Sequence, residues 1–167
     1  MIKNKFNIIS GERATWRSTL LLDISKIFAE SGSKVCFVGG TEEFNNTQQL
    51  DILSNLFECH FFNKNDIGTF EMIFEMEDKF DILVIDDIDY IDKYFHPTIF
   101  LINKPIICTC LSDADILKMP LTLSENSKIF NIVDNSTIEF DNTKMGIKDF
   151  VKQLQRELKL NSLLDEE

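Results

Sequence analysis

The stretch FNIISGERATWRSTLLLDISKIFAE, residues 6 to 30, decides the fold of this chain. Its first five residues form a short apolar run that stops at Gly11, which is typical of a buried strand followed by a turn. From Arg17 to Glu30 the apolar residues recur at intervals of three and four, which predicts a helix that ends before the pair Ser31-Gly32. We therefore expect strand, loop and helix in immediate succession.

The central strand of the sheet is predicted from FDILVIDDIDYI, residues 80 to 91. After Asp81 this stretch has an uninterrupted Ile, Leu and Val run, as a parallel strand covered on both faces requires, and we expect it to lie beside the strand of residues 6–10. Alternating strands and helices imply an α/β three-layer sandwich with a mostly parallel central sheet. Further strands are predicted over residues 34–38, 59–62, 106–110, 128–133 and 137–140, and further helices over residues 44–57, 70–77 and 147–160.

Length and composition limit the class of protein. The 167 residues predict a single domain, 1–167, with a core over about residues 6–140 and a C-terminal helix over about 147–160. A content of 44% hydrophobic and 27% charged residues excludes disordered and fibrous classes. The chain has 17 Lys and Arg against 28 Asp and Glu, a net charge of −11, which disfavours a bare nucleic-acid or anionic-membrane surface.

The cysteines and the apolar runs indicate the compartment. We see no signal peptide and no apolar run near the roughly 18 residues that span a bilayer, so we expect a soluble cytoplasmic protein. Cys108 and Cys110 are expected to point to opposite faces of their strand, and with only two histidines in the chain we expect no zinc site. The cysteines have no regular disulfide spacing, which favours a reducing interior: Cys36, Cys59, Cys108 and Cys110.

The loop GERATWRS, residues 11–18, has the length of the phosphate-binding pattern G-x-x-x-x-G-K-[ST]. Gly11 and Ser18 match the pattern, whereas Trp16 replaces its second glycine and Arg17 its lysine. Backbone N–H groups between a strand and a helix N-terminus form an anion site. The segment is therefore a candidate phosphate loop, and the alternative is an ordinary strand-to-helix turn capped by Ser18.

Acidic residues follow two of the predicted strands. Asp86 ends the central strand, with Asp87 and Asp89 after it, and Glu42 and Glu43 follow an earlier strand. Ligands of such sheets bind beyond the carboxyl ends of the strands, so Asp86 lies where a magnesium-bound nucleotide needs a carboxylate. The alternatives are a solvated strand exit for the aspartates, and for the glutamates a charge that complements the helix dipole.

With this loop and this carboxylate, the sequence resembles the P-loop NTPase superfamily, and within it the RecA/DnaB-like ATPase branch, over roughly residues 6 to 112. The resemblance implies a RecA-like core that binds ATP with Mg²⁺. It also implies that the backbone amides of residues 12–18 cradle the β-phosphate. The nucleotide-binding residues would be Gly11, Thr15, Arg17, Ser18 and Thr19.

The resemblance further implies a role for each polar residue around the phosphates. Ser18 would hold Mg²⁺ directly and Asp86 would support it through water. Glu42 or Glu43 would polarise the attacking water. Thr109, near the end of its strand, would lie where a polar γ-phosphate sensor sits.

Two departures from the family pattern weaken the expected catalysis. The planar guanidinium of Arg17 keeps the charge of the lysine but cannot occupy the same position as an ammonium group. Trp16 replaces a glycine that lets the backbone approach the phosphates, and a strained non-glycine residue costs on the order of 1–3 kcal/mol. The indole of Trp16 has two interpretations, a hydrophobic plug at the start of the helix or an anchor for a protein partner.

Two functions follow from the sequence. The first is a degenerate ATPase-like protein that acts as a protein-interaction or regulatory module, in DNA replication, repair or recombination as the resemblance implies. The alternative is a nucleotide-binding protein with weak or oligomer-dependent ATPase activity. We expect no efficient hydrolysis, no membrane contact, weak or indirect nucleic-acid contact and a protein partner. A homo-oligomer is a separate alternative that the sequence leaves open. The composition suggests a viral source, and hence the interior of a host cell.

Overall fold

The computed structural model describes residues 6–11, 17–39, 59–63, 68–86, 98–110, 127–134 and 136–164. It contains an eight-stranded sheet with the order β3-β2-β4-β5-β1-β6-β7-β8. The strands are β1 (Phe6–Ser10), β2 (Val35–Gly39), β3 (Cys59–Asn63), β4 (Ile82–Ile85), β5 (Ile106–Cys110), β6 (Ser127–Asp134), β7 (Thr137–Phe140) and β8 (Thr143–Gly146). The helical elements are α1 (Arg17–Glu30), α3 (Thr69–Glu75), the 3₁₀ turn η2 (Glu77–Lys79), α4 (Thr98–Leu101) and α7 (Ile147–Leu164).

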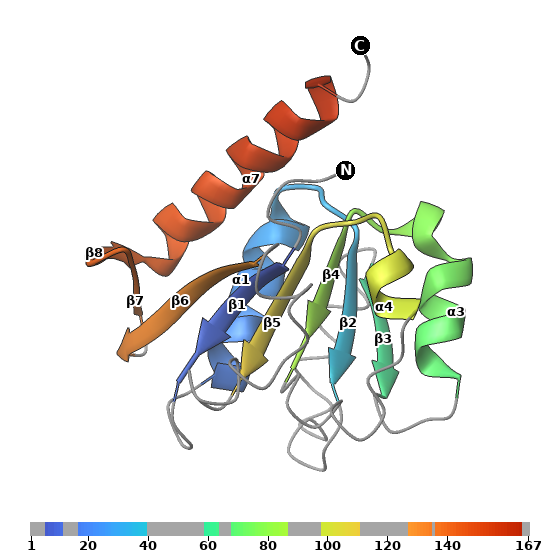
Figure 1. Cartoon of the computed structure of the whole chain (residues 1–167), viewed down its shortest axis with the longest axis horizontal. Coiled ribbons are helices and arrows are strands. Elements are labelled where there is room, and N and C mark those ends of the chain that lie inside the picture. Colours follow the sequence, from blue (N-terminus) through green and yellow to red (C-terminus); the bar gives the residue numbers. More distant parts are fainter. Residues whose placement is uncertain are drawn as a thin grey trace.

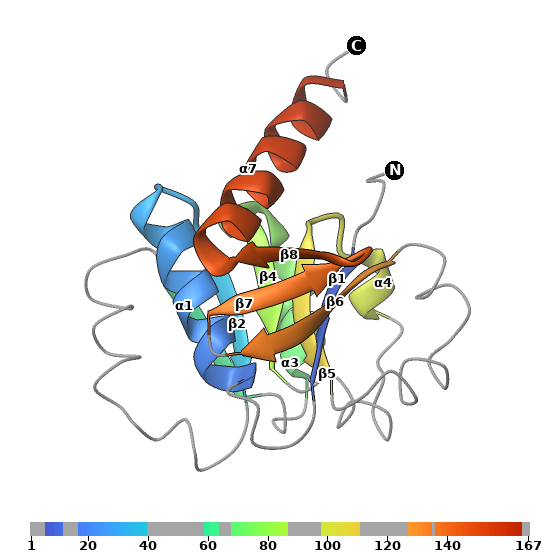
Figure 2. The ribbon, with the colours of Figure 1, turned by 90° about the vertical axis from the view of Figure 1, so that its left-hand side faces the viewer.

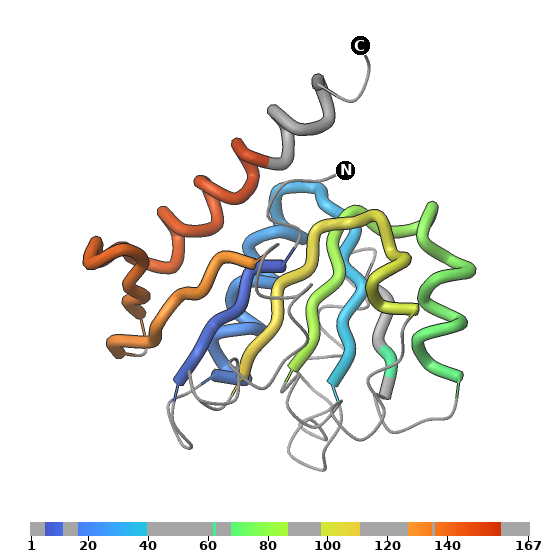
Figure 3. Tube along the Cα trace, viewed as in Figure 1, coloured from blue at the N-terminus to red at the C-terminus, as the bar shows by residue number. Residues whose placement is uncertain are grey.

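Neighbouring strands from β3 to β6 in the sheet order pair in parallel, whereas β7 pairs antiparallel with both β6 and β8. The carboxyl ends of the parallel strands therefore lie along one edge, where the arrowheads point in Figure 1. Figure 3 traces the same path along the Cα atoms. This arrangement confirms the predicted mostly parallel α/β sheet.

The prediction that β1 and β4 are neighbours in the sheet is wrong, because β5 lies between them. Cys108 of β5 is in register with Ile8 of β1 on one side and with Ile85 of β4 on the other. All five residues of β5 are buried, which suits a strand covered on both faces and paired on both edges. The two strands that carry the candidate site are thus separated by one strand, and β5 contributes to the site as well.

Helices cover both faces of the sheet, which confirms the three-layer sandwich (Figure 2). On one face, α3 and α4 pack over a cluster that includes Phe6 and Ile8 of β1. On the other, α1 and α7 pack over a cluster that includes Ile9. Successive residues of β1 thus enter opposite layers, as the pleat of a strand requires. None of the helices that the structure describes is long and apolar enough to cross a membrane.

The prediction that Cys108 and Cys110 point to opposite faces is wrong, because residues two apart on a strand share a face. Both side chains lie, fully buried, in the cluster under α3 and α4. Cys36 belongs to the same cluster, and burial raises the pKa of its thiol to about 12. The three cysteines are free thiols. They act as small apolar residues of the core.

Helix α1 has the bounds that its periodicity predicts, and its end is stabilised by a Schellman motif. The N–H of Gly32 donates to the carbonyl of Ala29, and the N–H of Ser33 donates to that of Phe28. Gly32 has φ +91°, a left-handed conformation that a residue without Cβ adopts without strain. The chain therefore leaves α1 directly into β2.

Strand β8 was not predicted from the sequence. It pairs with β7 through a two-residue turn in which Asp141 and Asn142 have φ of 48° and 61°. Both values fall in the left-handed region, which Asp and Asn tolerate better than most residues and which suits the twist of a hairpin. The pair Asp141-Asn142 is the signal that could have predicted this hairpin.

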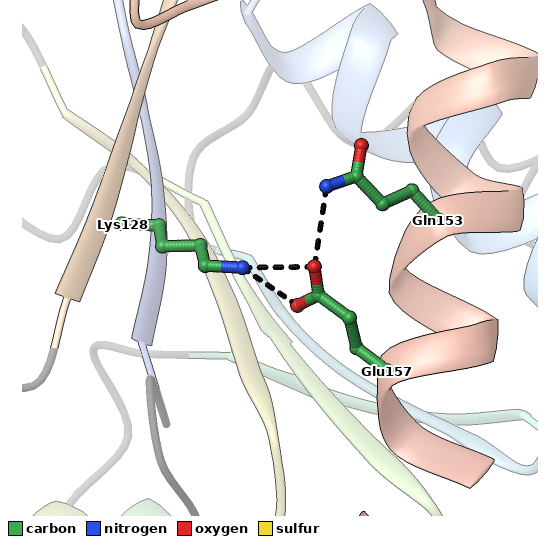
Figure 4. A network of polar contacts seen from close by, with 3 residues as sticks. All are labelled: Lys128, Gln153 and Glu157. Carbon is green, nitrogen blue, oxygen red and sulfur yellow. Dashed lines mark hydrogen bonds and ion pairs between the residues drawn. The ribbon is translucent and has the colours of Figure 1, made fainter. Parts of the chain in front are cut away.

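Helix α7 is attached to the body of the protein by apolar and polar contacts. Phe150, Val151 and Leu154 are buried against the sheet, and the ring of Phe150 meets that of Phe130 edge-on at a centroid distance of 4.7 Å. Further along α7, Glu157 accepts hydrogen bonds from two groups: the ammonium of Lys128 on β6 donates to both carboxylate oxygens, and the side-chain amide of Gln153 donates to Oε1, as Figure 4 shows. The apolar contacts supply most of the stability, because partly exposed ion pairs contribute little.

Replacing Phe150 by Ala should lower the free energy of unfolding by about 3–5 kcal/mol, because it removes a fully buried ring and leaves a cavity. Urea denaturation measures the loss. The matched control is Phe74→Ala on α3, where the side chain is 41% exposed and the loss should be clearly smaller. Equal losses at the two positions would show that α7 is not packed on the sheet as described.

Candidate functional site

The ends of β1, β4 and β5 meet at the carboxyl edge of the sheet. β1 leads into Gly11, whose N–H donates to the carbonyl of Cys110 at 3.3 Å and so ties the start of the loop to the end of β5. α1 then begins at Arg17. The loop therefore connects a buried strand to the N-terminus of a helix of 14 residues. Backbone N–H groups at the N-terminus of a helix this long stabilise an anion.

Asp86 lies at the centre of this edge, directly after β4. Its backbone N–H donates to the carbonyl of Val38 at 2.8 Å, which continues the pairing of β4 with β2 by one residue. Its side chain accepts two hydroxyl hydrogen bonds: Ser18 Oγ donates to Oδ2 at 2.8 Å, and Thr109 Oγ1 donates to Oδ1 at 2.9 Å. One carboxylate thus links the first turn of α1 to β5.

The site is shielded from water. Asp86 is 3% exposed and Thr109 is fully buried, whereas Ser18 is half-buried. A carboxylate removed from water is costly unless hydrogen bonds replace its hydration, and the two hydroxyls do so here. The network therefore fixes the orientation of Asp86 from both sides.

The donor set suits a hard cation that shares its coordination with a ligand. Ser18 and Asp86 offer a hydroxyl and a carboxylate, the oxygen donors that Mg²⁺ prefers. Within the described ranges, no group of three or more His, Cys, Asp or Glu residues is placed to hold a metal. A cation bound by Ser18 and Asp86 would therefore complete its coordination with water and phosphate oxygens, as Mg²⁺ commonly does.

Two solved structures share this architecture at low sequence identity. The flagellar accessory protein FlaH from Methanocaldococcus jannaschii matches with a TM-score of 0.50 and 15% identity, over 86% of this chain and 76% of its own. The KaiC-like protein PH0186 from Pyrococcus horikoshii OT3 matches with a TM-score of 0.55 and 13% identity, over 83% and 79%. The chain shares their RecA-like fold, a mostly parallel α/β sheet covered by helices. No protein-family model and no curated protein matches the sequence.

Within this RecA-like fold, the structure brings the two predicted metal ligands together. Ser18 and Asp86, 68 residues apart in the sequence, are in direct contact. The side chain of Arg17 is half-buried, and its Nη1 atom is shielded from solvent. The side chain of Thr19, by contrast, is exposed. The exposed side chain of Thr19 distinguishes it from Ser18, although the resemblance implied nucleotide binding for both residues.

Several predicted site residues lie outside the described residues. These are two residues of the candidate phosphate loop and the two glutamates proposed for catalysis: Thr15, Trp16, Glu42 and Glu43. Their roles, and the altered conformation expected at Trp16, stay predictions. For the candidate phosphate loop, the structure describes the flanking segments: β1 and Gly11 before it, and α1 after it.

The bond between Thr109 and Asp86 was not predicted. The sequence placed Thr109 near a bound phosphate, whereas its hydroxyl contacts a carboxylate of the protein. The register explains this contact: Ile85 is paired with Cys108, so the residues that follow them, Asp86 and Thr109, stand opposite each other. The sequence signal for this contact is a polar residue near the end of a buried strand. The identity of its hydrogen-bond partner, however, depends on which strand lies alongside.

Thr109→Val should lower the free energy of unfolding by about 1–3 kcal/mol, because it keeps the shape of the side chain while leaving Asp86 Oδ1 without this hydroxyl donor. Thr19→Val is the matched control, since its side chain is exposed, and should change stability by no more than about 0.5 kcal/mol. Chemical denaturation of both variants checks this. An unchanged free energy of unfolding in the Thr109→Val variant would contradict the hydrogen bond between Thr109 and Asp86.

Proposed function

We propose that this chain binds a nucleoside triphosphate together with Mg²⁺ where β1, β4 and β5 end. The observation that carries the proposal is the buried network of Ser18, Asp86 and Thr109. Asp86 is a buried carboxylate, and it contacts the hydroxyl of Ser18 in the first turn of the helix that follows the candidate phosphate loop. This pair of donors supports a site for a metal-bound anion. The RecA-like fold of the chain supports the same class of ligand.

In this proposal Ser18 and Asp86 hold the metal. Bound Mg²⁺ would neutralise charge on the phosphates. Thr109 acts as a positioning residue: it occupies Oδ1 of Asp86 and leaves Oδ2 turned toward Ser18. The contact between Oδ2 of Asp86 and the hydroxyl of Ser18 supports this proposal, because it brings together the two oxygen donors that the metal would need.

The phosphates are attracted by the N-terminus of α1 and by Arg17. The helix dipole favours negative charge at the first turn, and a guanidinium binds phosphate oxygens in a bidentate fashion. The partial burial of Arg17 supports a role at the site rather than on the open surface. The proposal covers binding and makes no claim of hydrolysis.

The second candidate is a protein-interaction or regulatory module that keeps the fold without the nucleotide. Trp16 and Arg17 favour it, because both depart from the phosphate-loop pattern. The network of Asp86 would then be a structural connection between α1, β4 and β5. A role in DNA metabolism stays a prediction from the resemblance.

The first test is a thermal-shift titration with ATP, ADP and GTP, each with and without Mg²⁺. A ligand that binds only the folded state stabilises it by about 2.7 kcal/mol at a hundredfold excess over Kd, so Mg²⁺-ATP should raise Tm. Asp86→Asn should abolish the part of the shift that depends on Mg²⁺, because an amide is a poorer ligand for a hard cation. No shift at millimolar nucleotide would favour the second candidate.

Asp81→Asn is the matched control for this titration. Asp81 is an exposed carboxylate before the other end of β4, where it accepts a hydrogen bond from the N–H of Lys34 at 2.7 Å. Its replacement should leave the nucleotide-induced shift unchanged. Loss of the shift in both variants would indicate a general weakening of the fold and would not support a metal site at Asp86.

The double variant Trp16→Gly/Arg17→Lys should bind Mg²⁺-ATP at least about tenfold more tightly than the natural chain, because it restores both altered positions of the phosphate loop. Isothermal titration calorimetry measures the change in affinity. An unchanged or lower affinity would show that these two residues do not limit binding, and would tell against the candidate phosphate loop.

A further inference from the structure

The layer formed by α3 and α4 exposes large apolar side chains to solvent. Within the described residues four large apolar side chains are exposed, and three of them lie on these two helices: Met72, Phe74 and Leu101. Leu101 is the most exposed of them, at 64%. Single exposed apolar side chains are common on protein surfaces, whereas a group of them on adjoining elements indicates a contact surface.

A hydrogen bond brings two of these side chains to the same part of the surface. The backbone N–H of Asn103 donates to Oε1 of Glu77, which ties the segment after α4 to η2. Leu101 lies two residues before Asn103, and Phe74 lies three residues before Glu77. We call Phe74 and Leu101 the apolar patch. Met72 is two residues from Phe74 and therefore lies on the other side of α3.

The chain around the apolar patch is acidic. Residues 69–81 carry five carboxylates and one ammonium group, a net charge of −4: Glu71, Glu75, Glu77, Asp78, Asp81 and Lys79. Glu75 and Asp78 are exposed, and each lies within four residues of Phe74. We call Glu75 and Asp78 the acidic border. Apolar side chains surrounded by polar or charged ones are the usual composition of a protein interface.

The helices under the apolar patch limit the shape of a partner. α3 and α4 lie side by side over the sheet, at the end away from α7 (Figure 1). An extended peptide binds by adding to a free strand edge, and no strand edge is part of this surface. A helix, in contrast, can place an apolar stripe against the side chains of two neighbouring helices. The surface therefore suits an amphipathic helix.

The basic helix of this chain does not meet these requirements. α7 exposes Lys148, Lys152 and Arg156, but its apolar side chains, among them Phe150 and Leu154, are buried against its own sheet. A second copy could therefore offer cations from α7 to the surface but no apolar stripe. This favours an occupant from a different protein.

We propose that the apolar patch and the acidic border bind a basic amphipathic helix of another protein. Its apolar stripe covers Phe74 and Leu101, and its lysine or arginine side chains lie beside Glu75 and Asp78. The occupant is basic because the border is acidic and the whole chain has a net charge of −11. The proposal does not rest on nucleotide binding, because η2 and the end of α4 precede the amino ends of β4 and β5, whereas the candidate site lies at their carboxyl ends.

The probe for this surface is a synthetic amphipathic peptide of about 18 residues, or five helical turns, with leucine every three or four residues and lysine between. Fluorescence anisotropy measures its binding to the full chain. The natural chain should bind it at least about tenfold more tightly than a scrambled peptide of the same composition, because scrambling keeps the charge and removes the apolar stripe.

Phe74→Gln/Leu101→Gln tests the apolar patch and should weaken binding of the amphipathic peptide by at least about tenfold. The matched control is Met72→Gln, which replaces a comparably exposed side chain on the other side of α3 and should bind like the natural chain. Glutamine is a good helix former, so the variants should stay folded, as circular dichroism checks.

Glu75→Lys/Asp78→Lys tests the acidic border and should weaken binding of the lysine peptide by at least about tenfold. A peptide with glutamate in place of lysine should bind this variant more tightly than it binds the natural chain, which a misfolded variant would not do. The control is Asp23→Lys/Glu30→Lys on α1, which makes the same change in net charge at exposed positions on the opposite layer. It should weaken binding far less.

Three results would overturn the proposal. The natural chain binds neither peptide, or it binds the amphipathic and scrambled peptides equally, or the patch and border variants bind as it does. Sedimentation velocity tests the competing occupant: self-association that Phe74→Gln/Leu101→Gln abolishes would assign the surface to a second copy instead. Asp86→Asn should bind the peptide like the natural chain, so a failure here is distinguishable from a failure of the nucleotide site.

Discussion

The arrangement of this protein depends on one buried carboxylate. Asp86 follows β4 and accepts hydrogen bonds from α1 and from β5, through Ser18 and Thr109. A buried carboxylate must keep such partners, because losing one leaves a desolvated acceptor. The start of α1 is therefore held in place relative to the sheet, and with it the loop that precedes this helix. The same bonds that stabilise the fold orient the candidate metal ligand, so stability and function are coupled at this residue.

The sheet order explains how three segments that are far apart in the sequence form one site. Parallel strands end at the same edge, so β1, β4 and β5 deliver Gly11, Asp86 and Thr109 to neighbouring positions. Helices on both faces bury these strands, which keeps the site away from water. The exposed parts of α3 and α7 lie away from this edge, at the two ends of the sheet.

Sequence patterns predicted the fold best where a local rule applies. The bounds of β1, α1 and β5 follow from apolar runs, periodicity and the Gly32 cap. The prediction failed where the result depends on long-range pairing or on overlooked local geometry. β5 rather than β4 lies beside β1, the turn at Asp141-Asn142 forms an additional hairpin, and the two cysteines of β5 share one face.

For the candidate site, the sequence by itself determined the residue types: a loop of phosphate-binding length, a hydroxyl at the first turn of a helix and a carboxylate after a buried strand. These follow from spacing and from the period of each element, which are local properties. Only the tertiary structure decided that Ser18 and Thr109 bond the same carboxylate, and that the charges of α3 and α7 lie at opposite ends of the sheet. The physical reason is that strand order and register are set by the packing of the whole sheet, which no local segment encodes.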